Sequence, residues 1–167
     1  MALFLGSNVG NYEPAAAAAL LRSIAGALRP GDALLLGTDL KKSIERLELA
    51  YDDPTGVTAA FNKNLLARMN RELGADFDLD AFRFRANWDD AGGAVRSYLV
   101  AERAQRVRIP LAEVSVEFGR GDAIHTESSY KFSRDEIVAL ASRCGYTERV
   151  TYTDAGGRYA LSLLIVA

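Results

Sequence analysis

Most of the side chains that could do chemistry lie in one short polar stretch. Residues 121–132 read GDAIHTESSYKF and hold the only histidine of the chain, His125, beside two carboxylates, three hydroxyl groups, a phenol and a lysine. Burying so many polar groups without partners is unfavourable. The stretch lies between a strand-like run and a helix start, so we expect a loop, and functional residues are common on loops. The alternative is a solvated loop whose hydroxyl groups cap the next helix.

Length and composition indicate a soluble globular protein. The chain has 167 residues, of which 49% are apolar and 25% are charged, enough for one domain with a real core. The formal net charge is −2, which gives no basic field for nucleic acid or a membrane surface, so we expect neither as a partner. No run reaches the length of a membrane span. Cys144 stands alone, which suits a reducing compartment, and we expect a cytoplasmic protein.

The first 39 residues predict a strand, a helix and a second strand. Residues 3–5 are a continuous apolar run, and residues 33–39 form an apolar run with polar residues at its carboxyl end, as in strands that are buried on both faces. Between them Pro14 suits the first turn of a helix that has one apolar stripe. Open α/β sheets bind ligands at the carboxyl ends of their strands. The polar residues expected along that rim are Ser7, Asn8, Asn11, Thr38 and Asp39.

No nucleotide-binding fingerprint accompanies this rim. The turn from Gly6 to Gly10 is neither a Gly-x-Gly-x-x-Gly turn nor a phosphate loop, which would need a Lys-Ser or Lys-Thr pair. Because the chain opens directly on a strand of buried type, we expect it to begin partway through a fold.

Residues 42–131 predict two helices followed by antiparallel strands. The first helix is capped by Ser43 and carries Ile44 and Leu47, and the second has Asp53 as its cap and Pro54 at its first position. Asn62 and Asn64 of the second helix are expected to be solvated or to pack at helix ends, and not to be ligands. Its expected buried face repeats every four residues, at Val57, Phe61, Leu65, Met69 and Leu73. Strands are predicted over 81–88, 94–103, 105–109 and 113–118.

The last 35 residues predict a helix and a hairpin. Ser133 and Glu136 form a capping box that opens the helix, whose inward residues are Ile137, Leu140, Ala141 and Cys144. Strands over 148–154 and 159–166 flank a glycine turn. A late helix with an antiparallel strand pair is similar to the closing edge of a methyltransferase sheet.

Five stretches in order carry a resemblance to a known family. The chain resembles the carboxyl-terminal half of the histidine-specific, S-adenosylmethionine-dependent N-methyltransferases of ergothioneine biosynthesis. The stretches are FLGSNVGN at 4–11, LLLGTDL at 34–40, AYDDPTGVTAAFN at 50–62, NRELGADFDLDAF at 70–82 and IHTESSYKF at 124–132. The resemblance covers essentially the whole chain.

The resemblance implies a substrate site built from four residues. Asn11 would bind the α-amine and carboxylate of the amino acid, and Tyr51 would help to hold the carboxylate. Glu127 and Ser129 would hydrogen-bond the imidazole, whose one donor and one acceptor nitrogen they match. An analogue lacking either group would leave buried polar groups unpaired, which selects histidine. His125 is expected to be structural, and no metal is expected.

The resemblance also implies the fold class and its division. We expect an α/β protein: half of a Rossmann-like methyltransferase sheet (1–41 and 132–167) with an inserted α+β substrate-recognition domain (42–131). The main S-adenosylmethionine motif of the family has no counterpart here. A truncated enzyme, inactive alone, is therefore expected, and the exposed edge at 3–5 predicts a homo-oligomer.

Two alternatives remain open from the sequence. The chain could be a non-catalytic amino-acid-binding or assembly module derived from the family. It could also be a methyltransferase piece that takes another aromatic amino acid, although Glu127 and Ser129 favour an imidazole.

Overall fold

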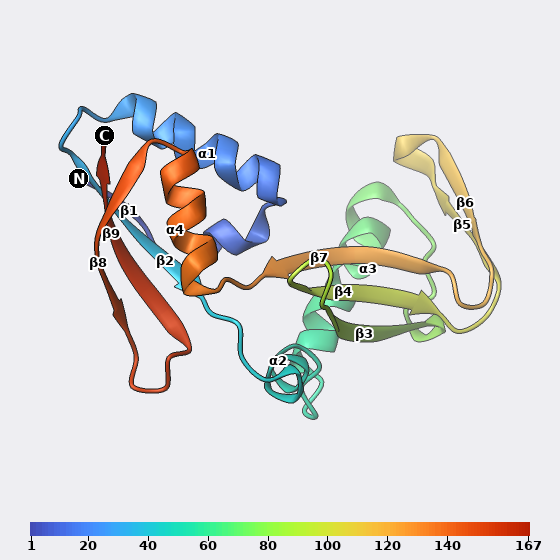
Figure 1. The fold of residues 1–167 in the computed structure, drawn as a ribbon. Coiled ribbons are helices and arrows are strands. Elements are labelled where there is room, and N and C mark those ends of the chain that lie inside the picture. The colour runs from blue at the N-terminus through green and yellow to red at the C-terminus, as the bar shows by residue number, and fades with distance from the viewer. The chain divides into compact units, whose positions relative to one another are not determined.

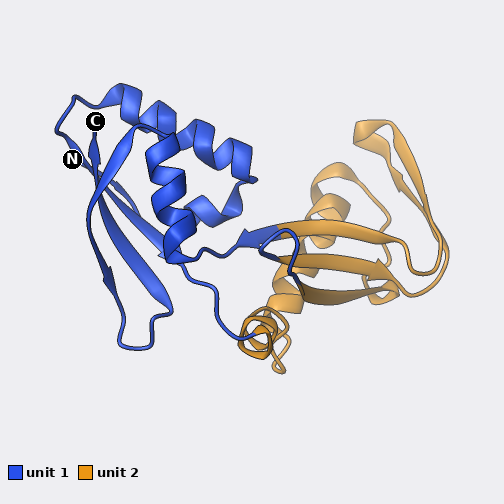
Figure 2. Ribbon diagram, viewed as in Figure 1, with its two compact units in different colours: residues 1–43, 89–94, 128–167 blue, residues 44–88, 95–127 orange.

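The computed structural model describes residues 1–167 and divides into two compact units (Figure 2). Unit 1 comprises residues 1–43, 89–94 and 128–167, and unit 2 comprises residues 44–88 and 95–127. No helix is both long enough and apolar enough to cross a membrane.

Unit 1 is built on a four-stranded sheet in the order β1-β2-β9-β8 (Figure 1). Its strands are β1 (Ala2–Phe4), β2 (Ala33–Asp39), β8 (Tyr146–Thr153) and β9 (Tyr159–Val166). β1 and β2 are parallel, as the strand–helix–strand pattern predicts, and the other pairs are antiparallel. β1 is an edge strand, because β2 is its only neighbour.

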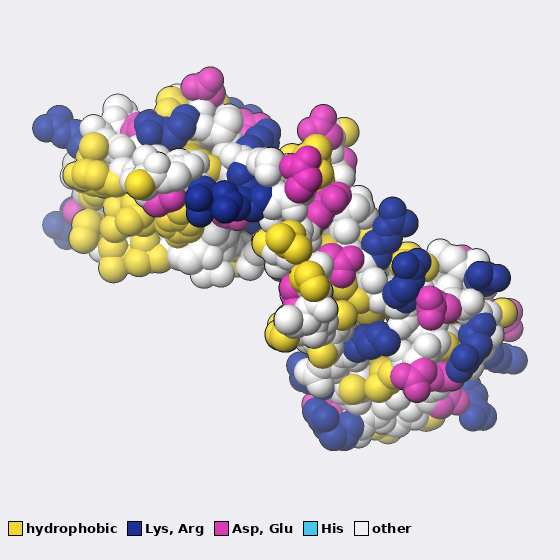
Figure 3. All heavy atoms as spheres, turned by 90° about the horizontal axis from the view of Figure 1, so that it is seen from below, with side chains coloured by type: hydrophobic (Ala, Val, Ile, Leu, Met, Phe, Trp, Pro, Cys, Tyr) yellow, Lys and Arg dark blue, Asp and Glu magenta, His cyan; other side chains and the backbone are white.

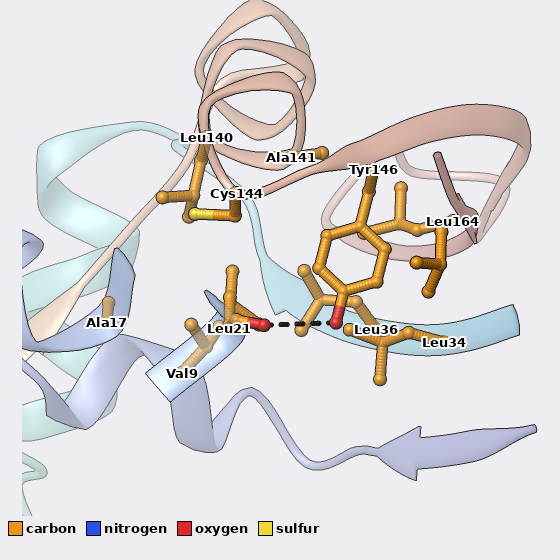
Figure 4. Packing of buried hydrophobic residues seen from close by; sticks show 11 residues of the cluster. Val9, Ala17, Leu21, Leu34, Leu36, Leu140, Ala141, Cys144, Tyr146 and Leu164 are labelled. Carbon is orange, nitrogen blue, oxygen red and sulfur yellow. Dashed lines mark hydrogen bonds between the residues drawn. The ribbon is translucent and has the colours of Figure 1, made fainter. Parts of the chain in front are cut away.

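Two helices pack on one face of this sheet, where every second residue of β9 is buried. They are α1 (Pro14–Ala27) and α4 (Arg134–Arg143), and the 3-10 turn η1 (Asn8–Asn11) precedes α1. Their shared core is aliphatic, with one phenol inside it (Figure 4). The Tyr146 hydroxyl donates a hydrogen bond to the backbone oxygen of Leu21 at 3.0 Å, so this buried polar group is paired. Burial raises the pKa of both Tyr146 and Cys144.

The opposite face of the sheet carries apolar side chains that stay partly exposed. The register aligns Leu3 with Leu35, and Leu35 with Leu163, in a row across three strands. Leu3 is 59% exposed. Hydrophobic atoms accordingly gather on part of the surface of unit 1 (Figure 3).

Unit 2 combines two helices, a three-stranded sheet in the order β3-β4-β7 and a two-stranded ribbon. Its core joins three phenylalanine rings, Phe77, Phe82 and Phe118, with aliphatic side chains from α3 and β4. The 3-10 turns η2 (Leu79–Ala81) and η3 (Pro110–Ala112) lie between its elements. The helices and strands are α2 (Ile44–Tyr51), α3 (Val57–Leu73), β3 (Phe82–Asp89), β4 (Ala94–Ala101), β5 (Gln105–Ile109), β6 (Val114–Phe118) and β7 (Ala123–Tyr130).

The polar stretch 121–132 is mostly a strand and not the loop that its composition predicts. β7 runs through Ala123–Tyr130. A sheet pairs the backbone groups of such a segment, which lets polar side chains occupy it when they have partners of their own. The helix cap after it is as expected: Ser133 accepts from the Glu136 amide, and Glu136 accepts from the Ser133 amide.

The start of α3 differs from the sequence prediction. The helix begins at Val57, so Pro54 lies in the preceding turn. The carboxylate of Asp53 still serves the helix, because it accepts from the amides of Val57 at 3.1 Å and Thr58 at 2.8 Å. These hydrogen bonds, together with that from Thr55, hold the pKa of Asp53 well below its usual range.

The buried face of α3 was predicted wrongly at four of its five positions, and only Met69 packs against the core. Val57 and Phe61 are 69% and 75% exposed, and Leu65 and Leu73 are exposed as well. Leu66 and Asn62 face the core instead, with Asn62 only 5% exposed. Asn62 tolerates burial because its Oδ1 accepts from the Thr126 hydroxyl at 2.6 Å and its Nδ2 donates to the Thr58 oxygen at 3.0 Å.

Two smaller expectations about side-chain direction hold only in part. On α2, Leu47 is buried but Ile44 is 47% exposed. Thr38 is fully buried, so its side chain does not lie on the polar rim with Ser7 and Asp39.

Candidate functional site

The end of β7 places Ser129 beside a buried lysine. Ser129 and Lys131 are 7% and 4% exposed, and the Lys131 ammonium donates to the Ser129 hydroxyl oxygen at 2.9 Å. The same ammonium pairs with Asp39 Oδ2 at 2.9 Å. Asp39 Oδ1 lies 2.5 Å from the Lys42 ammonium. Lys42, Asp39 and Lys131 are therefore joined in a row of charge-assisted contacts, and Lys131 connects this row to Ser129.

Backbone bonds fix this arrangement from both sides. The Phe132 amide donates to the Asp39 oxygen at 3.0 Å, and the Lys41 amide donates to the Phe132 oxygen at 3.0 Å. Leu40 and Phe132 form a parallel bridge. The segment after Ser129 thus continues alongside the end of β2, where open α/β sheets present their ligand-binding rim.

Asn11 lies in η1, which closely approaches the end of β7. A Cβ atom on Gly10 would lie 2.6 Å from the backbone oxygen of Tyr130, so only glycine permits this approach. Ser7 has a positive φ of 57° and its hydroxyl accepts from the Asp39 amide at 2.8 Å. The turn is therefore held against both strand ends, and it brings Asn11 and Ser129 into one neighbourhood of unit 1.

A second contact holds β7 to the start of α1. The Tyr130 hydroxyl donates to Glu13 Oε2 at 2.5 Å. Tyr130 is 7% exposed, so the side chains of Ser129 and Tyr130 are both buried although neighbouring residues of a strand point to opposite faces. Both faces of this part of the polar stretch are therefore buried.

Tyr51 and Glu127, the other two predicted site residues, belong to unit 2. Tyr51 is the last residue of α2 and packs partly on the core. Glu127 is half-buried and lines a hollow of about 370 Å³ with residues of α3. Because side chains alternate along a strand, Glu127 points to the same side of β7 as Ser129.

Two further features bear on the predicted chemistry. His125 is exposed and its ring lies 5.3 Å from that of Tyr98, which agrees with a structural contact. No group of three or more His, Cys, Asp or Glu side chains is placed to hold a metal ion.

A cavity of about 180 Å³ in unit 1 lies beside the site, but none of the four predicted residues lines it. Glu136, Arg143 and Tyr12 contribute to its wall. Partial burial acts to raise the pKa of Glu136, but the hydrogen bonds from Lys41 and the Ser133 amide outweigh it, so that pKa lies below its ordinary value. The hydrogen-bonded group at Ser129 lies instead at the carboxyl end of β2, where open α/β sheets bind ligands.

Sequence reasoning missed Lys131 and the structural role of Gly10. The spacing of Lys131, two residues beyond Ser129 and four beyond Glu127, was an available signal, because it puts all three on one side of an extended segment. The close approach at Gly10 depends on a distant strand, so no local pattern could have shown it.

Comparison with known proteins gives a consistent picture. Residues 1–166 match the sequence model of a family described as histidine-specific, SAM-dependent methyltransferases. The chain is 46% identical over 165 residues to the histidine N-alpha-methyltransferase of Mycolicibacterium smegmatis, covering 99% of this chain and 51% of that protein. It is 47% identical over 161 residues to the enzyme of the same name from Mycobacterium tuberculosis, covering 96% and 50%. The chain thus spans about half the length of these relatives.

More distant comparisons agree in name and in fold. Ergothioneine biosynthesis protein 1 of Schizosaccharomyces pombe is 35% identical over 142 residues, covering 84% of this chain and 18% of that protein. A solved S-adenosylmethionine-dependent methyltransferase from Clostridium acetobutylicum superimposes with a TM-score of 0.50 at 7% identity, covering 99% of this chain and 57% of that one. This likeness confirms the expected fold, a partial Rossmann-like methyltransferase sheet. The comparisons do not favour the non-catalytic module.

Proposed function

Because the chain belongs to the family of histidine-specific, SAM-dependent methyltransferases, we propose that it forms the substrate-binding half of an enzyme that methylates the α-amine of histidine. The observation that carries the proposal is the close packing of η1 against the end of β7. That packing puts Asn11 in the same neighbourhood as Ser129, two residues that contact opposite ends of the amino acid in this proposal.

The roles proposed for the four residues are those that the family resemblance implies, and the chemistry of histidine agrees with them. Glu127 accepts the N–H of a neutral imidazole, and the Ser129 hydroxyl serves the other ring nitrogen. Asn11 offers an amide to the α-amine and carboxylate, and Tyr51 offers its hydroxyl to the carboxylate. Glu127 is the sharper determinant, because a ring without a donor leaves a half-buried carboxylate unpaired.

Methylation requires an uncharged amine whose lone pair is aimed at the methyl donor, so the protein contributes chiefly orientation. S-adenosylmethionine supplies the methyl group when it is bound. The chain has no Gly-x-Gly-x-x-Gly turn, and the outer side of β1 has no neighbouring strand that could present one. Its own residues therefore do not fit a complete cofactor site, and we infer that this chain does not transfer a methyl group alone.

Calorimetric titration of the purified chain with histidine, and separately with S-adenosylmethionine, tests the proposal. We expect heat for histidine, its loss in Glu127→Ala, and no heat for the cofactor. Glu117→Ala is the matched control, since it removes an exposed carboxylate from the separate β5-β6 ribbon. Histidine binding that survives Glu127→Ala and Ser129→Ala would contradict the assignment of the site.

The amino-acid class is tested in the same experiment. Tryptophan, tyrosine and phenylalanine lack the ring nitrogen pair that Glu127 and Ser129 match. Histidine is therefore expected to give the tightest binding. A stronger response to another aromatic amino acid would keep the methyltransferase proposal and replace its substrate.

We further propose that unit 1 corresponds to the Rossmann-like methyltransferase part and unit 2 to the substrate-recognition part. The parallel strand pair with α1 supports the first assignment, and Tyr51 and Glu127 support the second. The boundary residues 89–94 group with unit 1, although the sequence places them in the recognition domain.

Self-association through the edge at 3–5 is also proposed for this chain. β1 pairs on one side only, and Leu3 and Leu5 are 59% and 41% exposed. An exposed apolar edge is a template for pairing with another chain. Light scattering should show a dimer or larger species that Leu3→Lys dissociates, whereas a monomer at all concentrations would contradict this. Independence from nucleic acid and a cytoplasmic location stay predictions of the sequence.

A further inference from the structure

We propose that the open face of the sheet in unit 1, the side away from α1 and α4, is a docking surface for apolar helices. These helices belong to a polypeptide that supplies the part of the methyltransferase fold that this chain does not match. The proposal deepens the proposed function and rests on it, because it takes the chain as half of a methyltransferase and names the surface that completes it.

The open face is apolar across all four strands. The register places Leu3, Leu35, Leu163 and Val150 in one row, and Leu161 pairs with Tyr152 beside it. Tyr152 is 62% exposed, and the residues of β9 on this side are half-buried. β9 contains no charged residue. Hydrophobic atoms gather on this part of the molecule (Figure 3), so the face has the composition of an interaction surface.

The distribution of residues along β9 indicates that both of its sides are suited to burial. Side chains alternate between the two faces of a strand. The side covered by helices holds the polar Ser162, whose hydroxyl lies 2.7 Å from that of Thr151. The open side holds Leu161, Leu163 and Ile165. A sheet face that remains in water normally carries polar side chains, so this pattern indicates a covering layer.

The comparisons indicate what covers the open face. The chain spans 51% and 50% of the two histidine N-alpha-methyltransferases, and 57% of the solved methyltransferase from Clostridium acetobutylicum. A substantial part of the fold therefore lies outside the part that this chain matches. Doubly wound α/β sheets carry helices on both faces. In unit 1 both helices pack on one face, which leaves the other face for helices from the remainder of the fold.

The parallel pair of β1 and β2 favours helices over a second copy of this chain. Parallel strands are joined by crossover helices, and sheets of this kind are covered by helices on both sides. The occupant therefore needs an apolar stripe that repeats at helical spacing, three and four residues apart. A second copy would instead present another sheet face.

Co-expression tests the proposal, because neither half then has to fold alone. The chain is produced with an affinity-tagged segment of the Mycolicibacterium smegmatis enzyme, namely the residues of that enzyme outside the matched region. We expect a 1:1 complex. Leu163 lies between Leu35 and Val150, so Leu163→Glu puts a carboxylate into the middle of the face. Recovery of the complex should fall at least about 10-fold, because burying an unpaired charge is strongly unfavourable.

Val138→Glu is the matched control. Val138 is 43% exposed on α4, on the other side of unit 1, and its replacement should leave recovery of the complex within about 2-fold of wild type. If Leu163→Glu does not fold, Tyr152→Glu takes its place, since that side chain is already largely exposed. Absence of a complex with the wild-type chain, or equal recovery with the face variant, would overturn the inference. A homodimer of the chain alone that Leu163→Glu dissociates would assign the face to a second copy and overturn it too.

Failure of this inference can be told from failure of the proposed function, because the complex is measured without histidine. Heat with histidine but no complex would keep the proposed function and overturn only the docking surface. A complex that depends on Leu163 and gives no heat with histidine would keep the docking surface and overturn the proposed substrate site.

Discussion

The two units bury their polar groups in different places. Unit 1 keeps an aliphatic core between its sheet and helices, and concentrates buried charge at the strand ends, where Lys131 meets Asp39. Unit 2 places polar side chains inside its helix–sheet interface, where the Thr126 hydroxyl contacts Asn62 Oδ1 and the backbone oxygen of Ser97. The buried residues of α4 in unit 1 are all apolar. The buried residues of α3 in unit 2 include Asn62, whose hydrogen bond to Thr126 of another element helps to select the packed face.

Leu66 gives the largest expected effect and tests this difference in unit 2. Leu66 is fully buried, so Leu66→Ala should lower the free energy of unfolding by about 2–5 kcal/mol. Phe61→Ala, on the exposed side of the same helix, should change it by no more than about 0.5 kcal/mol. Urea unfolding followed by the fluorescence of Trp88, which packs against the core of unit 2, measures both. Similar losses would mean that α3 packs through its apolar repeat after all.

The Asn62–Thr126 contact tests the polar part of the comparison. Thr126→Val removes the donor to a buried amide oxygen, which should cost about 1–3 kcal/mol of unfolding free energy. Asn62→Leu combined with Thr126→Val should cost less than the sum of the single changes, because neither partner is then left unpaired. The same fluorescence assay measures the unfolding free energies of all variants in the cycle. Strict additivity would mean that the contact does not help to determine which face of α3 is buried.

Local patterns predicted α4 and failed on α3 for a physical reason. The buried residues of α4 are Ile137, Leu140 and Ala141, all on the apolar stripe after a capping box. On α3 the most regular apolar repeat includes Phe61 and faces solvent. The decisive partner of Asn62 lies 64 residues further along the chain, beyond the reach of any window of periodicity.

In the candidate site, too, some features could be predicted from the sequence and others depend on residues that are distant in the chain. Asn11, Tyr51, Glu127 and Ser129 could be proposed from the sequence because they lie in stretches that resemble a family. Lys131 was missed as a participant because its burial depends on Asp39, which is distant in sequence and arrives through the parallel bridge between Leu40 and Phe132. Polar composition alone favoured a loop at 121–132, since it does not report that the backbone is paired in a sheet.

Ser133 gives a smaller expected effect and sharpens the statement that α4 is determined locally. Ser133→Ala removes the cap of the Glu136 amide, whose distance to Ser133 Oγ is 3.2 Å, and should cost about 1 kcal/mol. Ser142→Ala, at an exposed position near the other end of α4, should change stability by no more than about 0.5 kcal/mol. Hydrogen exchange of the α4 amides measures both changes. Unchanged protection in Ser133→Ala would mean that packing, not the cap, defines where the helix begins.

The smallest expected effect is the pH dependence carried by Glu136. Its pKa is lowered in the folded chain, so its stabilising contribution is present above the unfolded pKa of about 4.3 and is lost as pH falls through the folded value. The Lys41 ammonium lies 2.6 Å away, but both side chains are substantially exposed, so the contribution is about a few tenths of a kcal/mol after solvent screening. Wild type should therefore be slightly more stable than Glu136→Gln at pH 6, and the gap should close at pH 3. At pH 6 this difference in stability should also shrink in 1 M salt, because the Debye length is then about 3 Å and the ion pair is screened. A gap that persists in acid would contradict the assignment of the effect to the charge of Glu136.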